Sequence, residues 1–288
     1  MLSCNFNWVN CKTQHNRTIQ FTIINFRVYY IYYMKPTYLC IGVQKGGTTS
    51  LIRYLNDHPE IFMNKWESHF FDRTLSDGEL TENDIEQYEK SLKTNKLIVG
   101  EKTPSYCYLR YAIDRIYNYN INMKLIIILR EPISRAFSQY NMGLNNQKKD
   151  LNDVNNKEIL KCFRDQEKYN LSKLVSNGDY HIVRGYYDEI LDYILSKFPR
   201  ENIYIGISEE IKEDKLRYYN EIFEFLGARK CEDLNENQDT HIKKYERPIP
   251  KELEERLYNI YKSHNEKLYE ILGRKIDIWE NYYNQLAS

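Results

Sequence analysis

Residues 38–55 constrain the fold of this 288-residue chain more than any other stretch. They begin with the apolar run YLCI, pass through GVQKGG and continue with apolar residues at helical spacing. Apolar residues, then glycines, then a period of 3.6 residues predict a strand, a tight loop and a helix. Backbone N–H groups converge where such a helix begins, and its dipole favours an anion. The stretch therefore predicts a phosphate-binding unit.

The side chains of this loop add positive charge and hydroxyl groups. The candidate phosphate ligands are Lys45, Gly46, Gly47, Thr48, Thr49 and Ser50. In the nucleoside triphosphate loop GxxxxGK[ST], a lysine follows the second glycine. Here Thr48 takes that position and the lysine comes three residues earlier. The departure favours a nucleotide with a different 5′ group, and a glycine-rich turn that binds nothing is the alternative.

Three further blocks accompany the loop. They read WESHFFD at residues 66–72, GEKTPSY at 100–106 and LREPISRAFSQY at 129–140. In this order and spacing, the four blocks resemble the sulfotransferase family, especially the heparan sulfate N- and 3-O-sulfotransferase branch and its bacterial relatives. The likeness extends over roughly residues 36–280. It implies transfer of a sulfuryl group from 3′-phosphoadenosine-5′-phosphosulfate (PAPS) to a hydroxyl or amine, with release of 3′,5′-adenosine diphosphate and no metal.

The resemblance implies catalytic roles for four residues. Glu67 matches the base that removes the acceptor's proton, and His69 would orient that base or the acceptor. Such a base is needed because a hydroxyl is a poor nucleophile until its proton is being removed. Lys45 and Lys102 would stabilise negative charge on the departing group. The alternatives are a solvated surface acid for Glu67, a packed or capping histidine for His69 and a surface lysine for Lys102.

A second set of residues is implied to bind the nucleotide. Arg130 and Ser138 match the family's ligands for the 3′-phosphate, and the planar guanidinium suits phosphate because it donates two hydrogen bonds at once. A plain salt bridge is the alternative for Arg130. The family's basic loop over the phosphates points to Lys243, Lys244 and Arg247, with a basic surface loop as the alternative.

Strands alternate with helices along the chain. Continuous apolar runs at residues 97–100, 124–129 and 203–207 predict buried strands. Helical patterns occupy residues 109–119, 159–174, 182–198 and 251–272, and residues 276–279 after the last helix are predicted to pack. We expect an α/β fold: a P-loop-like, three-layer α/β/α arrangement with a mostly parallel central sheet. Residues 34–288 would form one sulfotransferase domain.

Residues 1–33 precede this domain and are interpreted as a disordered or mis-assigned leader. Their apolar part is too short and too polar for a membrane span. The sequence favours a cytoplasmic location without membrane association, and a luminal, membrane-anchored protein is the alternative. The six cysteines show no CxxC spacing, which argues against a zinc site and favours reduced thiols.

Charge is balanced, with 41 basic and 41 acidic residues, so nucleic acid is not an expected partner. The expected partner is a small-molecule or glycan acceptor, most simply a carbohydrate. Two other classes stay open: a P-loop kinase or ATPase, and an inactive nucleotide-binding protein. The missing lysine after Gly47 argues against the first, and the retention of Lys45, Glu67 and Lys102 argues against the second.

Overall fold

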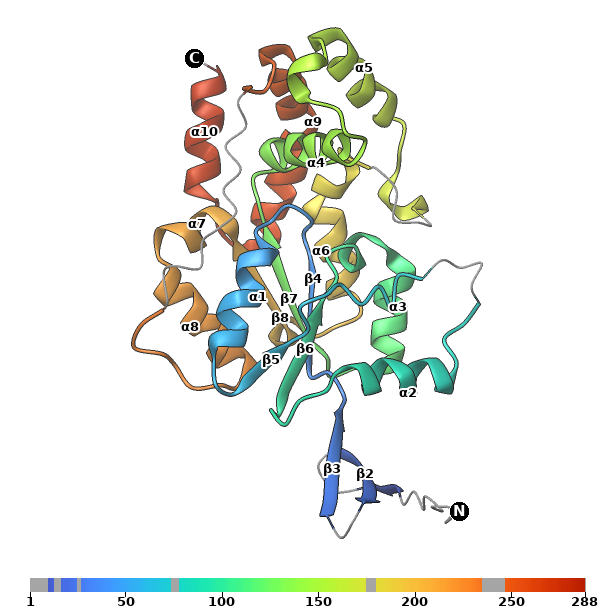
Figure 1. The fold of residues 1–288 in the computed structure, drawn as a ribbon. Coiled ribbons are helices and arrows are strands. Elements are labelled where there is room, and N and C mark those ends of the chain that lie inside the picture. Colours follow the sequence, from blue (N-terminus) through green and yellow to red (C-terminus); the bar gives the residue numbers. More distant parts are fainter. Residues whose placement is uncertain are drawn as a thin grey trace.

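A five-stranded sheet between two layers of helices forms the body of the molecule (Figure 1). The computed structural model describes residues 10–12, 17–24, 27–73, 78–174, 180–234 and 247–287, with the backbone alone before residue 34 and at residue 287. The strand order is β5-β6-β4-β7-β8, and all four pairings are parallel. The strands are β4 (Tyr38–Gly42), β5 (Ile61–Met63), β6 (Ile98–Lys102), β7 (Lys124–Leu129) and β8 (Ile203–Ile207). The predicted α/β class is confirmed.

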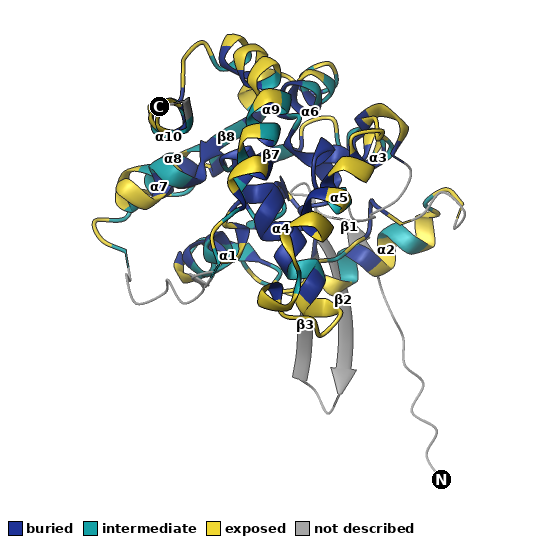
Figure 2. Ribbon diagram, turned by 90° about the horizontal axis from the view of Figure 1, so that it is seen from above, coloured by how far each residue is buried: buried dark blue, intermediate teal, exposed yellow. Residues whose placement is uncertain are grey.

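Helices cover both faces of this sheet. They are α1 (Thr48–Asp57), α2 (Glu82–Ser91), α3 (Arg110–Tyr119), α4 (Pro132–Asn146), α5 (Asn156–Gln166), α6 (Tyr187–Leu195), α7 (Ser208–Glu213), α8 (Lys215–Leu226), α9 (Lys251–Leu272) and α10 (Asp277–Ala287). Apolar residues of α1, α7 and α8 form one core cluster with the sheet, and those of α3, α4, α6 and α9 form the other. Seen from above, α4 lies near the centre, between α1 and α9 (Figure 2).

Strand β7 shows why the sheet is buried on both faces. Its residues Ile126 and Ile128 belong to the cluster with α1 and α8, whereas Leu125, Ile127 and Leu129 belong to the opposite one. Successive side chains of a strand point to opposite faces, so a strand covered on both sides must be apolar throughout. The run KLIIIL meets that requirement.

Two predicted helices are shorter in the structure. The pattern over 159–174 becomes α5 and a 3-10 turn, Leu171–Lys173, because the Asn170 side chain accepts the Ser172 N–H and starts a new turn. The pattern over 182–198 begins with the 3-10 turn Val183–Gly185 before α6. The predicted helix 251–272 matches α9, which ends at Gly273 in the left-handed conformation expected of a C-terminal glycine.

The N-terminal residues form a separate antiparallel sheet that the sequence analysis does not predict. Its strands are β1 (Asn10–Lys12), β2 (Arg17–Ile24) and β3 (Arg27–Met34), in that order. β3 leads directly into β4 and lies at the opposite end of the body from α4 (Figure 1). The division into a leader, residues 1–33, and a domain, residues 34–288, stays a prediction. Among the described residues, no helix has the length and apolarity to cross a membrane.

Candidate active site

The candidate residues gather at the carboxyl ends of the parallel strands. The glycine-rich loop follows β4, Glu67 follows β5, Lys102 ends β6 and Arg130 follows β7. The chain runs from β4 outward to β5, returns to β6 and then crosses to β7 on the other side of β4. In an open parallel sheet, ligands bind outside the carboxyl ends of the strands where the strand order reverses.

The loop after β4 is tight and ends at the start of α1. Gly47 precedes α1 with φ 91°, and no side chain caps this helix. A Cβ added at Gly46 would lie 2.4 Å from the Ile128 carbonyl oxygen, so only glycine fits without movement of the loop. The first N–H groups of a helix have no partner within the helix, and here none is taken by a capping side chain. The arrangement suits an anion.

Arg130 ties the end of β7 to this loop. Its guanidinium donates to the Lys45 carbonyl oxygen at 3.1 Å, and its own carbonyl accepts the Tyr187 hydroxyl at 2.7 Å. The Lys45 Nζ lies 3.9 Å from the Met142 sulfur in α4. Ser138, two turns into α4, is buried. The structure therefore brings the loop, the end of β7 and α4 together.

Glu67 lies between two cationic side chains. Its Oε1 is 2.9 Å from the Lys102 Nζ, and its Oε2 is 3.4 Å from the His69 Nε2. Burial raises the pKa of Glu67, but the hydrogen bonds from His69 and Lys102 outweigh burial and hold the pKa below its ordinary value. Lys102 is only 7% exposed and is therefore fixed in place. Glu67 is thus an ionised carboxylate at neutral pH, with the capacity to accept a proton.

His69 is held by a second carboxylate, Asp72. The His69 Nδ1 lies 2.9 Å from Asp72 Oδ2, and Ser105 donates its hydroxyl to the same oxygen. The hydrogen bonds to Asp72 and then Glu67 raise the pKa of His69 to about 10, so the imidazole is protonated at neutral pH. The sequence analysis missed Asp72. Its only sequence signal was its place in the block WESHFFD. Its contact with His69 depends on the turn at that histidine, whose φ is 47°.

Glu101 is a further acid that the sequence analysis did not single out. It is completely buried beside Lys102, and Thr103 donates to its Oε2 at 2.9 Å. The Thr103 hydroxyl also accepts the His69 N–H at 3.3 Å. Burial raises the pKa of Glu101 to about 7. Through Thr103, Glu101 is therefore linked to the backbone of His69, two residues after Glu67.

The sequence analysis also missed Arg184, which contacts the loop after β4 through Gln44. It is 3% exposed, donates to the Gln44 side-chain oxygen and lies 4.1 Å from the centre of the Tyr108 ring. It precedes Gly185, where a Cβ would lie 2.7 Å from the Tyr261 ring. No pattern in the sequence marks Arg184, because its place depends on the packing of Gly185 against Tyr261. Arg184 adds positive charge beside the glycine-rich loop.

The remaining candidates lie elsewhere. Lys243 and Lys244 fall outside the described residues. Arg247 donates to the Leu151 carbonyl at 3.0 Å and contacts Val154 and Asn156, so it lies on the connection between α4 and α5. Its predicted contact with the phosphates stays a prediction. Within the described ranges, no group of three His, Cys, Asp or Glu side chains is placed to hold a metal ion. Cys40, Cys107, Cys162 and Cys231 form no disulfide with one another.

Comparisons with known proteins agree with this geometry. The sulfotransferase domain profile matches residues 35–269. A mouse protein named heparan sulfate glucosamine 3-O-sulfotransferase 3B1 is 31% identical over 195 residues, which cover 68% of this chain and 47% of the mouse protein. The Dictyostelium discoideum membrane-associated sulfotransferase kil1 is 27% identical over 323 residues, covering 85% of this chain and 67% of that protein.

A solved structure shows the same fold. The sulfotransferase from Alicyclobacillus acidocaldarius superimposes with a TM-score of 0.66 at 23% sequence identity, covering 85% of this chain and 99% of that one. The alignments with the mammalian heparan sulfate relatives span about half of those relatives' length. Since the family profile covers most of this chain, from the strand before the glycine-rich loop into α9, the chain belongs to the sulfotransferase family.

Proposed function

We propose that this protein transfers a sulfuryl group from PAPS to a carbohydrate hydroxyl or amine. The observation that carries the proposal is the ionised Glu67, held between Lys102 and His69 at the strand edge that also carries the glycine-rich loop. Sulfuryl transfer needs a base for the acceptor's proton, positive charge for the leaving group and a site for the donor's phosphates. Glu67, the neighbouring cations and the glycine-rich loop would supply them. The reaction resembles phosphoryl transfer in its demand for positioning and charge stabilisation.

The residues present fit a bisphosphorylated nucleotide. The uncapped start of α1 and the close packing of Gly46 suit the 5′ group. Arg130, fixed at both its guanidinium and its carbonyl, and Ser138 in α4 suit the 3′-phosphate. The bound donor supplies an activated sulfuryl group whose leaving group is a phosphate oxygen. Lys243, Lys244 and Arg247 remain proposed further ligands.

The chain's own residues supply the acid–base chemistry. The Glu67 carboxylate accepts the proton of the acceptor hydroxyl as its oxygen attacks sulfur. The protonated His69 orients Glu67, and Asp72 fixes the imidazole through Nδ1. Lys102, paired with Glu67 in this structure, and Lys45 in the loop stabilise the negative charge that develops on the departing phosphate.

The acceptor class rests on two supports. Relatives are named for heparan sulfate glucosamine, and Trp66, immediately before Glu67, is 80% exposed. An exposed indole offers a large apolar face that loses water when a ring lies against it. We therefore propose that a sugar ring packs on Trp66 while its hydroxyl faces Glu67. Trp66→Ala should raise the acceptor KM at least fivefold and leave donor affinity unchanged.

Calorimetric titration tests the donor site. We expect 3′,5′-adenosine diphosphate to bind in the micromolar range or tighter, and ATP and 5′-AMP to bind much more weakly. Arg130→Ala should lose the preference for the bisphosphate, since a charged hydrogen-bonded pair is removed. Binding of ATP in its place, or of no nucleotide, would refute the proposal.

Membrane association is tested separately. The Dictyostelium relative is named as membrane-associated, and the sequence alone favours a cytoplasmic protein. Fractionation of cells that produce the tagged full chain distinguishes the two locations.

A further inference from the structure

The C-terminal helix α10 reaches the nucleotide end of the site, although it lies beyond the residues that the family profile matches. Two of its side chains, Trp279 and Tyr283, are four residues apart and therefore lie on one face of the helix. Both are almost completely buried. We infer that this face of α10 positions Arg130 and the start of α4 for binding of the 3′-phosphate. The inference rests on the proposed function.

Tyr283 acts on the side chain of Glu131, the residue after Arg130. Its hydroxyl donates to Glu131 Oε1 at 2.9 Å and accepts from Asn265 of α9 at 3.0 Å. The same Glu131 carboxylate caps α4, because it accepts the N–H groups of Ile133 at 2.9 Å and Ser134 at 2.6 Å. Glu131 is only 4% exposed. A buried carboxylate needs every one of these donors, so Tyr283 helps to fix where α4 begins.

Trp279 acts on the backbone of the same residue. Its indole N–H donates to Glu209 Oε2 at 3.1 Å, and Glu209 Oε1 accepts the Glu131 N–H at 3.2 Å. That N–H belongs to the peptide unit whose carbonyl, that of Arg130, accepts from Tyr187. The peptide between Arg130 and Glu131 is therefore held at both its oxygen and its nitrogen.

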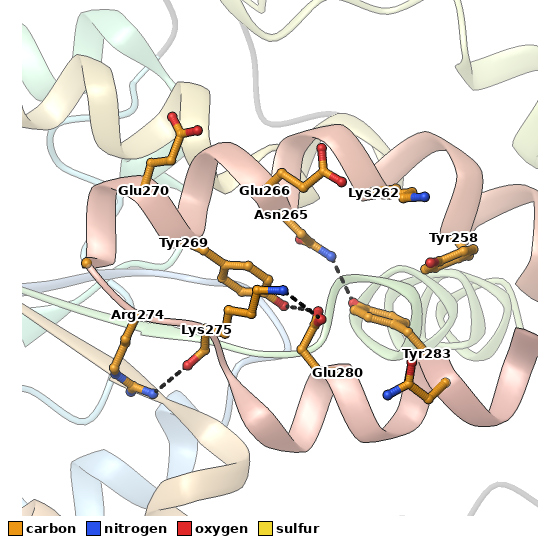
Figure 3. Close-up of a pocket in the computed structure, with 12 residues that line it drawn as sticks. Tyr258, Lys262, Asn265, Glu266, Tyr269, Glu270, Arg274, Lys275, Glu280 and Tyr283 are labelled. Carbon is orange, nitrogen blue, oxygen red and sulfur yellow. Dashed lines mark hydrogen bonds and ion pairs between the residues drawn. The ribbon is translucent and has the colours of Figure 1, made fainter.

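A cavity of about 470 Å³ is lined by residues of α9, α10 and the turn between them (Figure 3). Tyr258, Lys262 and Glu266 of α9 line one side of it, and Glu280 and Tyr283 of α10 line the other. The Asn265–Tyr283 hydrogen bond crosses between the two helices, as does the contact of Tyr269 with Glu280 (Figure 3). The Tyr282 hydroxyl and the Tyr258 ring also join α10 to α9, but the bonds of Tyr283 and Trp279 are the ones that reach Glu131.

The arrangement predicts a selective effect on the nucleotide. The 3′-phosphate would contact Arg130 and Ser138, which lie on the two sides of Glu131, at the end of β7 and in α4. The 5′ group would contact the loop after β4, which none of these bonds joins to α10 directly. The link from Arg130 to that loop is one hydrogen bond, to the Lys45 carbonyl. Loosening Glu131 should therefore weaken recognition of the 3′-phosphate and spare that of the 5′ group. A general loss of stability would not change this ratio.

The test uses the full chain with Tyr283→Phe, and Tyr282→Phe as its matched control. Tyr282 is the neighbouring tyrosine on α10, and its hydroxyl also donates to a glutamate, Glu254 of α9. Calorimetry measures the affinities for 3′,5′-adenosine diphosphate and for 5′-AMP. We expect Tyr283→Phe to weaken bisphosphate binding about tenfold, or about 1.4 kcal/mol, with less than a twofold change for 5′-AMP. Tyr282→Phe should change neither.

Hydrogen exchange gives a readout that needs no nucleotide. In Tyr283→Phe the amides of Ile133 and Ser134 should exchange faster than in Tyr282→Phe, because their shared acceptor is less firmly held. If the wild type binds no bisphosphate but exchange is still faster in Tyr283→Phe, the proposed function is refuted. The positioning of Glu131 and the start of α4 by α10 is then retained. Equal exchange in the two variants, or an unchanged affinity ratio between the two nucleotides, would overturn the inference.

Discussion

Replacement of Glu67 by glutamine separates its proposed role as a base from its role as a partner of Lys102 and His69. Glutamine keeps the shape of the side chain, and its amide oxygen can still accept a hydrogen bond from Lys102, which is 2.9 Å from the carboxylate in the wild type. The variant has no carboxylate to accept a proton. Its effect on turnover therefore reports the chemistry, provided that the fold and donor binding are retained.

The Glu67→Gln substitution should lower kcat strongly and should change stability and nucleotide affinity little. General-base catalysis contributes about 10²–10⁴-fold, so kcat should fall by that factor, or by roughly 2.7–5.4 kcal/mol in the barrier. The Glu67 side chain is 39% exposed and that of Lys102 is 8% exposed. Because glutamine keeps the hydrogen bond to Lys102, the variant loses only the attraction between the two charges, about 1 kcal/mol. The melting temperature should therefore fall by less than about 4 °C, and the affinity for 3′,5′-adenosine diphosphate should stay within twofold.

The assay follows transfer from ³⁵S-labelled PAPS to a heparan sulfate oligosaccharide as a function of pH. The pKa of Glu67 is below its ordinary value of 4.5, so the wild-type rate should fall only when the pH drops through that lowered value. It should be flat from about pH 6 to pH 9, since the pKa of His69 is about 10 and His69 stays protonated. A rate that climbs steadily up to pH 10 would make His69 the base. Retention of more than a tenth of the activity in Glu67→Gln would also refute our assignment.

Three further predictions concern the surroundings of Glu67 and the loop. Asp72→Asn removes the main cause of the raised pKa of His69; the pKa, followed by NMR, should move toward 6.5, and activity should then fall above pH 7 where the wild type is constant. Glu101 has a pKa of about 7 in the fold and an ordinary value of 4.5, so the wild type loses stability as pH rises between these values. Glu101→Gln should remove that loss and raise the free energy of unfolding at pH 8 by roughly 3 kcal/mol, with little change at pH 4.5; an equal gain at both pH values would contradict this prediction. Gly46→Ala places a methyl group 2.4 Å from a backbone oxygen of β7 and should weaken donor binding more than tenfold, whereas Gly143→Ala, with no atom within 4 Å, should not.

The sheet and its loop were predictable because their signals are local. The run at residues 124–129 admits few structures other than a buried strand, and glycines beside a short strand and a helix specify the loop. The helix at 251–272 was predicted with its bounds because its apolar period is long and it ends on glycine. Helix α10 was missed: residues 276–279 were interpreted only as packing, although Trp279, Tyr283 and Leu286 recur at helical spacing. Its position depends on distant partners, Glu131 and Glu209.

The site was partly predictable for the same reason. Glu67, Lys102 and Arg130 follow strands, so sheet topology brings them to one edge. Asp72 and Arg184 act through contacts that no short-range pattern encodes: the first depends on the turn at His69 and the second on the packing of Gly185 against α9. A sequence specifies the ends of strands more clearly than the side chains that loops bring beside them.

The distribution of charge in the site suits the proposed binding of a polyanionic nucleotide by a chain with no net charge. In the half that would hold the acceptor, Glu67 and Asp72 balance Lys102 and the protonated His69, and the four are linked by direct contacts. In the half that would hold the donor, Lys45, Arg130 and Arg184 surround the loop; Arg130 donates to a carbonyl and Arg184 to an amide oxygen. Positive potential is therefore concentrated where the phosphates would lie. In the acceptor half the four charges cancel, so Glu67 can stay ionised beside the sulfuryl group. The positive charge of Lys102 reduces the repulsion between the Glu67 carboxylate and the negative sulfuryl oxygens.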